Sequence, residues 1–562
     1  MHRLFNIREI VDQIIGSLYT PADFRMRPYC VDSQEARLAD RTAIQYSTLI
    51  ALACTSKEFL EQCLDLIWRD LDSLVPIFLL LGVPMRFFKA LDDERDEDGV
   101  RNEGDFQLPG VNIAELLANA DVGRASYYLR RVQKLYTDGD ELTYDLVDSL
   151  STILRSQEPR GSLFPKLSQL IWNVKIEGIE EHFDMFGSPS VTKLSVYPIE
   201  QVCSAHLHFP NLAEVEFFNF WVDMNPFNEY IALAIARLFP LRALDCSGYD
   251  IRVPAFDALS TMPALSRLCV AQFPSTVHIY TSAPGPPSRP FFPSLQELSI
   301  GTISARTCHD LLRTLDNPQA LKQFCVAIPE QEWTSAGMRN LVSCLSELCS
   351  PETLSGLALM LARNNNDLHR NHGVNQLHTG ASRATSEMLR PLLRFTKFTQ
   401  CDITAPILDY DDAFVESIAS ACPNLAILRL RSLSDQQDRS RLTLRSLYSV
   451  AKHCPKLGLV ALNNLVAGVG PEEDLGIGTM KRTWDNGGRM GVAIDIAGVD
   501  DVLGARAREV AVFVKDLFPE IMDFTEPRIH HFIRHGPDAA DYVPIQFPHV
   551  APALLPVPAI AN

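Results

Sequence analysis

The sequence is poor in basic residues, and this limits the ligands that it can bind. Its 562 residues include 51 Lys and Arg against 69 Asp and Glu, which gives a formal net charge of −18 at pH 7. Binding to a phosphate backbone needs clustered Lys and Arg, whereas the acidic excess here is spread over most of the chain. Nucleic acid is therefore disfavoured as a direct ligand.

Long apolar runs are missing as well. The longest run near the start, PIFLLLGVP at 76–84, is far shorter than the roughly 20 residues that cross a membrane. The opening stretch MHRLFNIREIVDQIIGSL carries charges throughout, unlike a signal peptide. We expect no membrane association and a cytoplasmic or nuclear location.

The cysteines show no disulfide or metal pattern. The chain has 13 of them, with no C-x-x-C pair and no regular framework. Several lie inside apolar runs, where a free thiol acts as a small hydrophobic residue: Cys246, Cys269, Cys325 and Cys344. This usage indicates a reducing compartment.

Motifs of catalysis and metal binding are also missing. No G-x-S-x-G and no H-E-x-x-H occurs in the chain. Histidines gather at His206 and His208 and at His530, His531 and His535, but no Cys or acidic partner stands at zinc spacing. We therefore predict no metal, no cofactor and no enzymatic activity for this chain.

Three amphipathic helices are predicted in the first 75 residues. Apolar residues recur at helical spacing over 6–18 and 56–74, and a shorter helix is expected over 46–54. The polar segment 19–45 is interpreted as an inserted loop. In the third helix one face comprises Leu60, Cys63, Leu64, Ile67 and Trp68. Because three short helices cannot bury such broad faces among themselves, part of this surface is expected to contact a partner.

A second pattern, L-x-x-L-x-L, recurs along the rest of the chain and is often introduced by Phe, Met or Cys followed by Pro. Clear copies are FPKLSQLIW (164–172), FPNLAEVEF (209–217), MPALSRLCV (262–270), FPSLQELSI (292–300), CPNLAILRL (422–430) and CPKLGLVAL (454–462), and RFTKF (394–398) is a degraded one. The middle anchors are Leu170, Leu194, Val215, Leu244, Leu268, Leu298, Phe324, Leu357, Leu428 and Val460. From Leu170 to Leu357 successive anchors are 21 to 33 residues apart, close to the period of leucine-rich repeats.

The repeats predict an α/β solenoid. In each copy the alternating apolar residues form a short strand, a helix returns the chain, and neighbouring units must stack because none buries its own apolar face. We therefore expect a three-helix unit in 1–75, an acidic loop and helical linker or cap in 76–155, and a leucine-rich-repeat array in 156–530. This array would have a curved parallel sheet with outer helices. The Pro- and Ala-rich residues 531–562 are expected to be a disordered tail.

The N-terminal segment resembles an F-box, which has an apolar helix, a connection, and a helix that ends close to a Trp. The first part is matched by Leu4, Ile7, Ile10, Ile14 and Leu18, and the second by Leu49, Leu52, Cys54, Phe59 and Trp68. The stretch TLIALACTSKEFLEQCLDLIWRDLDSLVPIFLLL is similar to F-box-like proteins abundant in mushroom-forming fungi, in which a leucine-rich array also follows. Two features depart from the family: Asn6 stands near the place of the usual proline, and the segment 19–45 is long.

The resemblance implies that the chain is the substrate-recognition subunit of a Skp–cullin–F-box ubiquitin ligase. Its N-terminal unit would bind a Skp-family adaptor and, through it, a cullin–RING ligase, while the repeats would bind a protein substrate. The residues expected at the adaptor contact are Leu4, Ile7, Ile10, Ile14, Leu49, Leu52, Leu64 and Trp68.

Two other interpretations stay open. The chain could be an F-box-like scaffold that assembles complexes without ubiquitin transfer, in which case cullin would not co-purify with the adaptor. It could also be a leucine-rich regulator or inhibitor of a hydrolase, with the N-terminal helices as caps whose deletion causes aggregation.

The substrate itself is unknown from the sequence. Candidates for its contact surface are the variable positions within the repeats, namely Ser168, Gln169, Glu214, Glu216, Arg242, Arg267 and Gln296.

Overall fold

The structure is a computed structural model of the chain. It describes residues 46–88, 113–138, 144–157, 163–173, 182, 185–197, 207–217, 241–251, 253–273, 291–362, 383–432, 442–462, 492–496, 507–518 and 521–524. The helix predicted over 6–18, the loop predicted over 19–45 and the tail predicted over 531–562 lie outside the described residues. The chain divides into two compact units: Met1–Ile303 with Arg313–Pro318, and Ser304–Leu312 with Gln319–Asn562.

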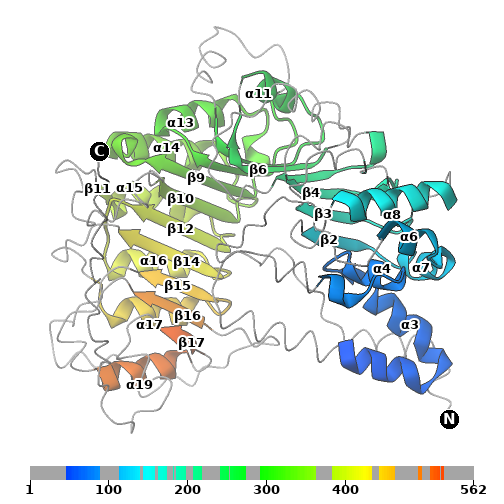
Figure 1. Ribbon diagram of the computed structural model, residues 1–562. Coiled ribbons are helices and arrows are strands. Elements are labelled where there is room, and N and C mark those ends of the chain that lie inside the picture. Colours follow the sequence, from blue (N-terminus) through cyan, green and yellow to red (C-terminus); the bar gives the residue numbers. More distant parts are fainter. Residues whose placement is uncertain are drawn as a thin grey trace, which may run out of the picture. The chain divides into compact units, whose positions relative to one another are not determined.

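The first unit combines a parallel sheet with helices (Figure 1). Its strands are β1 (Asp70–Leu71), β2 (Lys134–Asp138), β3 (Gln169–Asn173), β4 (Lys193–Tyr197), β5 (Glu214–Phe217), β6 (Ala243–Asp250), β7 (Arg267–Gln272) and β8 (Glu297–Thr302). Its helices are a stretch over 46–55, α3 (Lys57–Ile67), α4 (Val75–Leu80), α6 (Ile113–Ala118), α7 (Val122–Leu129), α8 (Tyr144–Gln157) and α11 (Val253–Ser260). Each strand pairs in parallel with the next strand along the chain, as a solenoid-like stacking of repeats requires.

One apolar anchor residue from each strand holds this sheet in register. Each anchor lies directly opposite the next, in the order Leu71, Leu135, Leu170, Leu194, Val215, Leu244, Leu268 and Leu298. From Leu135 onward these side chains are at most 2% exposed. The anchors predicted from Leu170 to Leu298 are confirmed. The parallel ladder nevertheless begins at β1, well before residue 156, so the predicted start of the array is wrong.

The second unit repeats this architecture. Its strands are β9 (Gln323–Pro329), β10 (Gly356–Ala362), β12 (Gln400–Ala405), β14 (Ile427–Ser432), β15 (Leu459–Leu462), β16 (Val492–Ile496) and β17 (Ile521–Phe524), paired in parallel in that order. A separate parallel pair is formed by β11 (Arg383–Thr385) and β13 (Ile407–Asp409). The helices are α13 (Ala305–Thr314), which starts in this unit, α14 (Ser335–Leu348), α15 (Ser386–Leu389), α16 (Asp412–Ala421), α17 (Leu444–His453) and α19 (Ala507–Leu517), with a 3₁₀ turn η9 (Arg390–Arg394).

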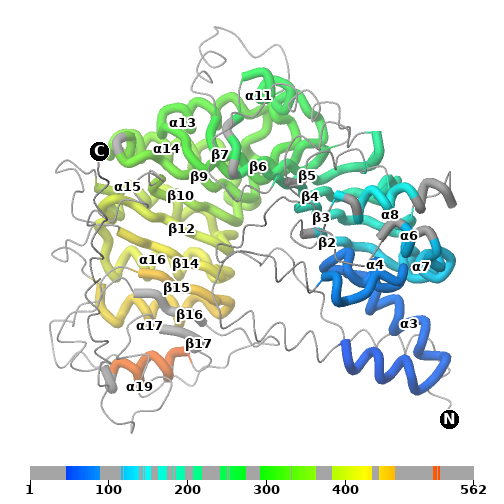
Figure 2. The backbone as a smooth tube through the Cα atoms, viewed as in Figure 1, coloured from blue at the N-terminus to red at the C-terminus, as the bar shows by residue number. Residues whose placement is uncertain are grey.

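Helices of the second unit form a layer beside its strands, as predicted. Contacts run from α14 to η9, from η9 to α16, from α16 to α17 and from α17 to α19. The tube in Figure 2 shows α14, α16 and α17 following one another along the row of strands. The helices therefore cover the apolar face that the strands leave open.

The anchors of the second unit are Phe324, Leu357, Cys401, Leu428 and Val460, each opposite the next and at most 1% exposed. Four of these were predicted. The fifth, Cys401, follows the stretch 394–398 that was interpreted as a degraded copy of the strand core. Phe395 and Phe398 are instead the buried residues of the preceding turn, and the strand begins at Gln400.

The Phe-Pro, Met-Pro and Cys-Pro signatures mark a turn before the strands that they introduce. The residue before the proline is buried, and its carbonyl accepts a hydrogen bond from the residue three positions on; Phe164–Leu167, Phe209–Leu212 and Cys422–Leu425 are examples at 3.0 to 3.1 Å. Hydroxyls directly before three strands also donate to the preceding repeat: Ser168 Oγ to the Gln133 carbonyl, Ser266 Oγ to that of Arg242, and Ser355 Oγ to that of Lys322. Each turn is thereby bonded to its neighbour on the backbone and on the side chain.

Most of the described cysteines act as core residues. Cys246 and Cys344 are buried as predicted, while Cys269 and Cys325 lie half-buried on the other face of their strands. Burial raises the pKa of the Cys349 thiol to about 12, so this group stays protonated and apolar.

Replacing Leu298 with Asp tests the register of the first unit. Leu298 is 2% exposed and lies opposite Leu268, so the substitution places a charge in the stacked core without a partner. We expect a loss of about 4 kcal/mol in the free energy of unfolding, measured by chemical denaturation followed by circular dichroism. The matched control is Leu207→Asp, because Leu207 is 70% exposed; an unchanged midpoint for Leu298→Asp would contradict the proposed core.

Candidate functional site

The helical stretch 46–55 and α3 form a small pair with its own core. Leu49 and Cys63 are fully buried at its centre, surrounded by Leu52, Ala53, Phe59, Leu66 and Ile67. Ser56 begins α3 as its N-cap, since its side chain accepts a hydrogen bond from the Glu58 backbone N–H at 3.2 Å. The helix ends at Trp68, which occupies the C-cap position.

The structure assigns the predicted adaptor residues to different environments. Leu49 is 0% exposed; it is a core residue, and a partner cannot contact its side chain without opening the pair. Leu52, Leu64 and Trp68 are half-buried and keep an accessible edge. The remaining four, Leu4, Ile7, Ile10 and Ile14, lie outside the described residues.

Two further apolar residues of the pair face solvent. Ile50 is 52% exposed and Leu60 is 37% exposed. Leu60 belongs to the predicted stripe of α3, but Ile50 was missed because the sequence does not say which of the adjacent residues Leu49 and Ile50 points inward. The apolar surface that this pair offers therefore includes Ile50, Leu60 and the accessible edge of Leu64.

A charged cluster fixes α3 to α7. Arg131, just after α7, is 5% exposed and binds two carboxylates of α3 through separate guanidinium nitrogens: Glu61 at 2.6 Å, and Asp65. The Tyr127 hydroxyl donates to the other oxygen of Glu61, and the Arg131 guanidinium lies 4.6 Å from the centre of the Tyr127 ring. Glu61 and Asp65 are four residues apart and so share one face of α3. We call Glu61, Asp65, Tyr127 and Arg131 the α3–α7 clamp.

Trp68 extends the same junction. Its ring lies 4.8 Å from that of Tyr128 on α7, and the Arg69 carbonyl accepts hydrogen bonds from the backbone N–H groups of Gln133 and Lys134 at 2.8 and 2.9 Å. The predicted boundary at residue 75 therefore does not separate the helices from the array. Instead α3 leads directly into the first strand of the sheet.

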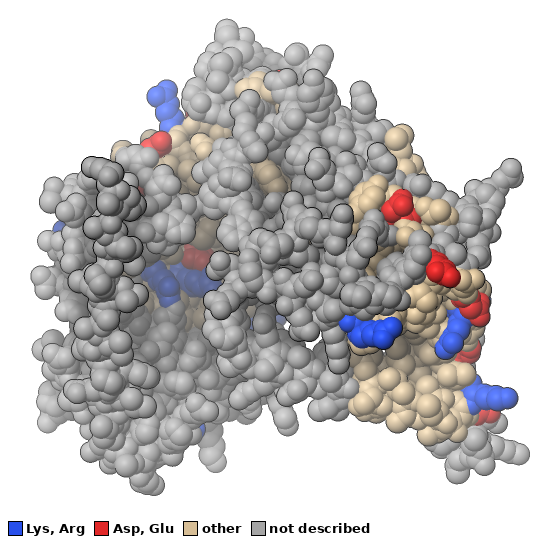
Figure 3. Space-filling view, viewed as in Figure 1, with Lys and Arg blue, Asp and Glu red and all other residues tan. Residues whose placement is uncertain are grey.

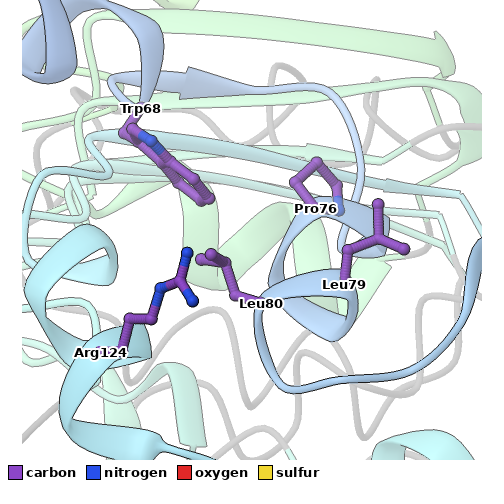
Figure 4. A pocket seen from close by; sticks show the side chains of 5 residues that line it. All are labelled: Trp68, Pro76, Leu79, Leu80 and Arg124. Atoms are coloured by element: carbon purple, nitrogen blue, oxygen red, sulfur yellow. The ribbon is translucent and has the colours of Figure 1, made fainter.

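An open groove lies beside this junction. It is lined by Trp68, Pro76, Leu79, Leu80 and Arg124 and has a volume of about 250 Å³. Figure 4 shows the side chains of Trp68, Leu80 and Arg124 converging on it from three separate elements.

The outer face of the first unit's sheet carries several predicted substrate residues, and three of them, Glu214, Glu216 and Arg267, are already paired with neighbouring side chains. Arg267 on β7 forms an ion pair with Glu214 on β5 at 3.3 Å. The strand between them, β6, has the small Ala243 at the paired position, so the two long side chains can meet above it. Glu216 accepts a hydrogen bond from Ser195 at 3.0 Å and lies 3.6 Å from Lys193. Two pairs of opposite charges thus connect neighbouring repeats on this face.

The other predicted positions differ in role. Gln169 is the first residue of β3 and shares the outer face with these charges. Ser168, Arg242 and Gln296 precede their strands, and Ser168 bonds the preceding repeat. Their contact with a substrate stays a prediction.

A charged pair also lies on the corresponding face in the described part of the second unit. Arg429 binds Asp402 at 2.9 Å, and the Asp402 side chain is only 6% exposed. On the side of the molecule drawn in Figure 3, described Lys and Arg residues occur singly or in small groups, several of them beside acidic residues.

Other site types have little support in the described part of the chain. No group of three or more His, Cys, Asp or Glu there could hold a metal ion. The histidines at 206, 530, 531 and 535 lie outside it. None of the described helices is long and apolar enough to span a membrane.

The α3–α7 clamp predicts an acid-sensitive contribution to stability. The hydrogen bond from Tyr127, followed by that from Arg131, lowers the pKa of Glu61. Because the folded-state pKa is depressed, this stabilisation is present above the unfolded value near 4.5 and is lost as the pH falls through the folded value. Glu61→Gln should therefore lower the unfolding midpoint at pH 7, by an amount equivalent to less than about 1 kcal/mol for so exposed a carboxylate, and this deficit should shrink below pH 4.5.

The measurement is thermal unfolding of both proteins from pH 3 to pH 7. Glu297→Gln, which removes a carboxylate from the same unit without touching α3, is the control. A deficit for Glu61→Gln that is equal at pH 3 and pH 7 would rule out the ionised clamp.

Comparison with known proteins gives limited information. No known family matches the sequence, and no curated protein matches it. Among solved structures, one titled "Crystal structure of Rad7 and Elc1 complex in yeast" is similar at 12% sequence identity, covering 78% of this chain and 94% of that chain with a TM-score of 0.38. A likeness at this level does not indicate a function for this chain.

Proposed function

We propose that this chain is a substrate-recognition subunit of a Skp–cullin–F-box ubiquitin ligase. The helical pair 46–67 would bind a Skp-family adaptor, and the repeats would hold a protein substrate. Catalysis would belong to other subunits, and this chain would contribute by keeping substrate and ligase close together.

One observation carries the proposal: a helical pair with exposed apolar residues is clamped to α7 and leads directly into the first strands of a parallel repeat array. Ile50 and Leu60 remain exposed on the pair although Leu49 and Cys63 complete its core. A capping unit would instead present a polar outer face. Exposed apolar side chains grouped on one small unit are typical of a docking surface.

The clamp suits this role. A receptor that brings a substrate to a ligase needs a stiff connection between its two binding surfaces, since a loose one dilutes the effective concentration of the substrate. Here Arg131 binds two turns of α3, and the residue after Trp68 begins the backbone pairing with β2. The helical pair therefore has a fixed attachment to the beginning of the array.

A scaffold without ubiquitin transfer is the alternative. It would use the same adaptor surface, so geometry does not separate the two functions. Their difference lies in the larger complex: the ligase subunit brings cullin with the adaptor, and the scaffold does not.

Substitutions at the exposed apolar residues test the adaptor surface. Ile50→Glu and Leu60→Glu should each weaken binding of a purified Skp-family adaptor by about tenfold or more, because each puts a charge into an apolar interface. Biolayer interferometry measures the affinity, and circular dichroism verifies that the variants fold. Leu207→Glu, at a still more exposed Leu outside the pair, should bind like the wild type.

Wild-type affinity in both variants would exclude this surface as the adaptor site. In a parallel purification from cells, recovery of cullin with the tagged wild-type chain supports the ligase subunit, and adaptor without cullin supports the scaffold.

A further inference from the structure

The groove beside Trp68 combines an apolar lining with one positive charge. Trp68, Pro76, Leu79 and Leu80 supply the apolar walls, and Arg124 lies at the edge. The guanidinium of Arg124 points towards the space between Trp68 and Leu80 (Figure 4). The site is thus shaped for one apolar side chain with a negative charge close to it.

The charge of Arg124 is available to a ligand. Among the residues that the structure describes, no carboxylate forms an ion pair with it. The nearest candidate along the chain, Asp121, is already used as the N-cap of α7, where its Oδ1 accepts a hydrogen bond from the Arg124 backbone N–H at 2.9 Å. By contrast, Arg131 in the same region binds two carboxylates.

The groove also has firm walls. Trp68 is held by its stacking on Tyr128 at 4.8 Å, and α4 contacts α7 directly. Leu79 is 36% exposed, so an apolar ligand would remove further surface from water. A preformed site of this kind loses little entropy when it binds.

We propose that this groove docks a short peptide segment of a partner protein, in which a large apolar side chain is followed directly by Asp or Glu. The apolar side chain would occupy the space between Trp68, Leu79 and Leu80, and the carboxylate would pair with Arg124. The groove shares Trp68 with the residues predicted at the adaptor contact, but Leu79, Leu80 and Arg124 lie outside the helical pair, and the site goes beyond the proposed adaptor contact.

Two fluorescein-labelled dodecapeptide libraries test the proposal on the full-length protein. They are identical and randomised except for a fixed central Leu-Glu in one and Leu-Gln in the other, and fluorescence polarisation measures binding. We expect the wild type to prefer the Leu-Glu library by about threefold, as an exposed charge pair allows.

Matched variants identify the groove. Arg124→Gln should abolish the preference while keeping the weaker binding, and Leu79→Ala should weaken binding of both libraries. The controls Arg339→Gln and Leu207→Ala, at exposed residues elsewhere, should behave like the wild type.

Equal binding of the two libraries by the wild type, or a preference that survives in Arg124→Gln, would overturn the proposal. It would also be overturned if binding appeared only after deletion of residues 92–105. That result would mean that the acidic stretch DDERDEDGVRNEGD of the same chain, and not a partner protein, occupies the groove. Failure of adaptor binding leaves these outcomes unaffected, since neither Arg124 nor Leu79 belongs to the helical pair.

Discussion

The parallel register of one buried residue per repeat is the constraint on which the rest of the structure depends. A unit of this kind has an apolar face that it cannot cover alone, so each anchor must lie opposite that of the next repeat. Because side chains alternate along a strand, this register also determines which residues reach the outer face. Arg267 meets Glu214 only because Leu268, Leu244 and Val215 are aligned beneath them.

The same constraint connects the helical pair to the array. α3 ends at Trp68, and within three residues the chain has entered the sheet at β1. The α3–α7 clamp then joins this helix to a second element that leads into β2. Arg131 is buried, whereas its two carboxylates are more than half exposed, so removing both carboxylates would leave a buried charge without a partner. The position of the proposed adaptor surface is therefore determined by the first two strands.

Much of the array could be predicted from the sequence, because its signal is periodic. In each clear copy a buried Phe, Met or Cys stands six residues before the anchor. The turn signal and the strand signal therefore predict the same repeat. No such Phe, Met or Cys signal precedes β1 or β2. In addition, β1 has only two residues, and Leu135 of β2 lies in the largely polar stretch KLYTD. Their place in the sheet depends on partners distant in the chain, which single-sequence patterns do not reveal.

The candidate site was less predictable for a related reason. Glu61 and Asp65 look like the solvated face of an amphipathic helix, and only the fold brings Arg131 to them from 66 to 70 residues away. Likewise, the resemblance to an F-box singled out Leu49 and Leu52 but could not say that α3 would cover Leu49 and leave Ile50 exposed. Spacing predicts which residues share a face of a helix. Whether that face is core or interface depends on which helix packs against it, and the spacing does not show this.

The central claim is that the helical pair, and not the repeat sheet, is the surface that receives a Skp-family adaptor. Hydrogen–deuterium exchange of the full chain with and without a purified adaptor tests it most directly. The account predicts slower exchange in peptides covering 46–67, with the strands β3 to β8 unchanged. Protection confined to those strands, or no protection anywhere in 46–67 at saturating adaptor, would contradict it.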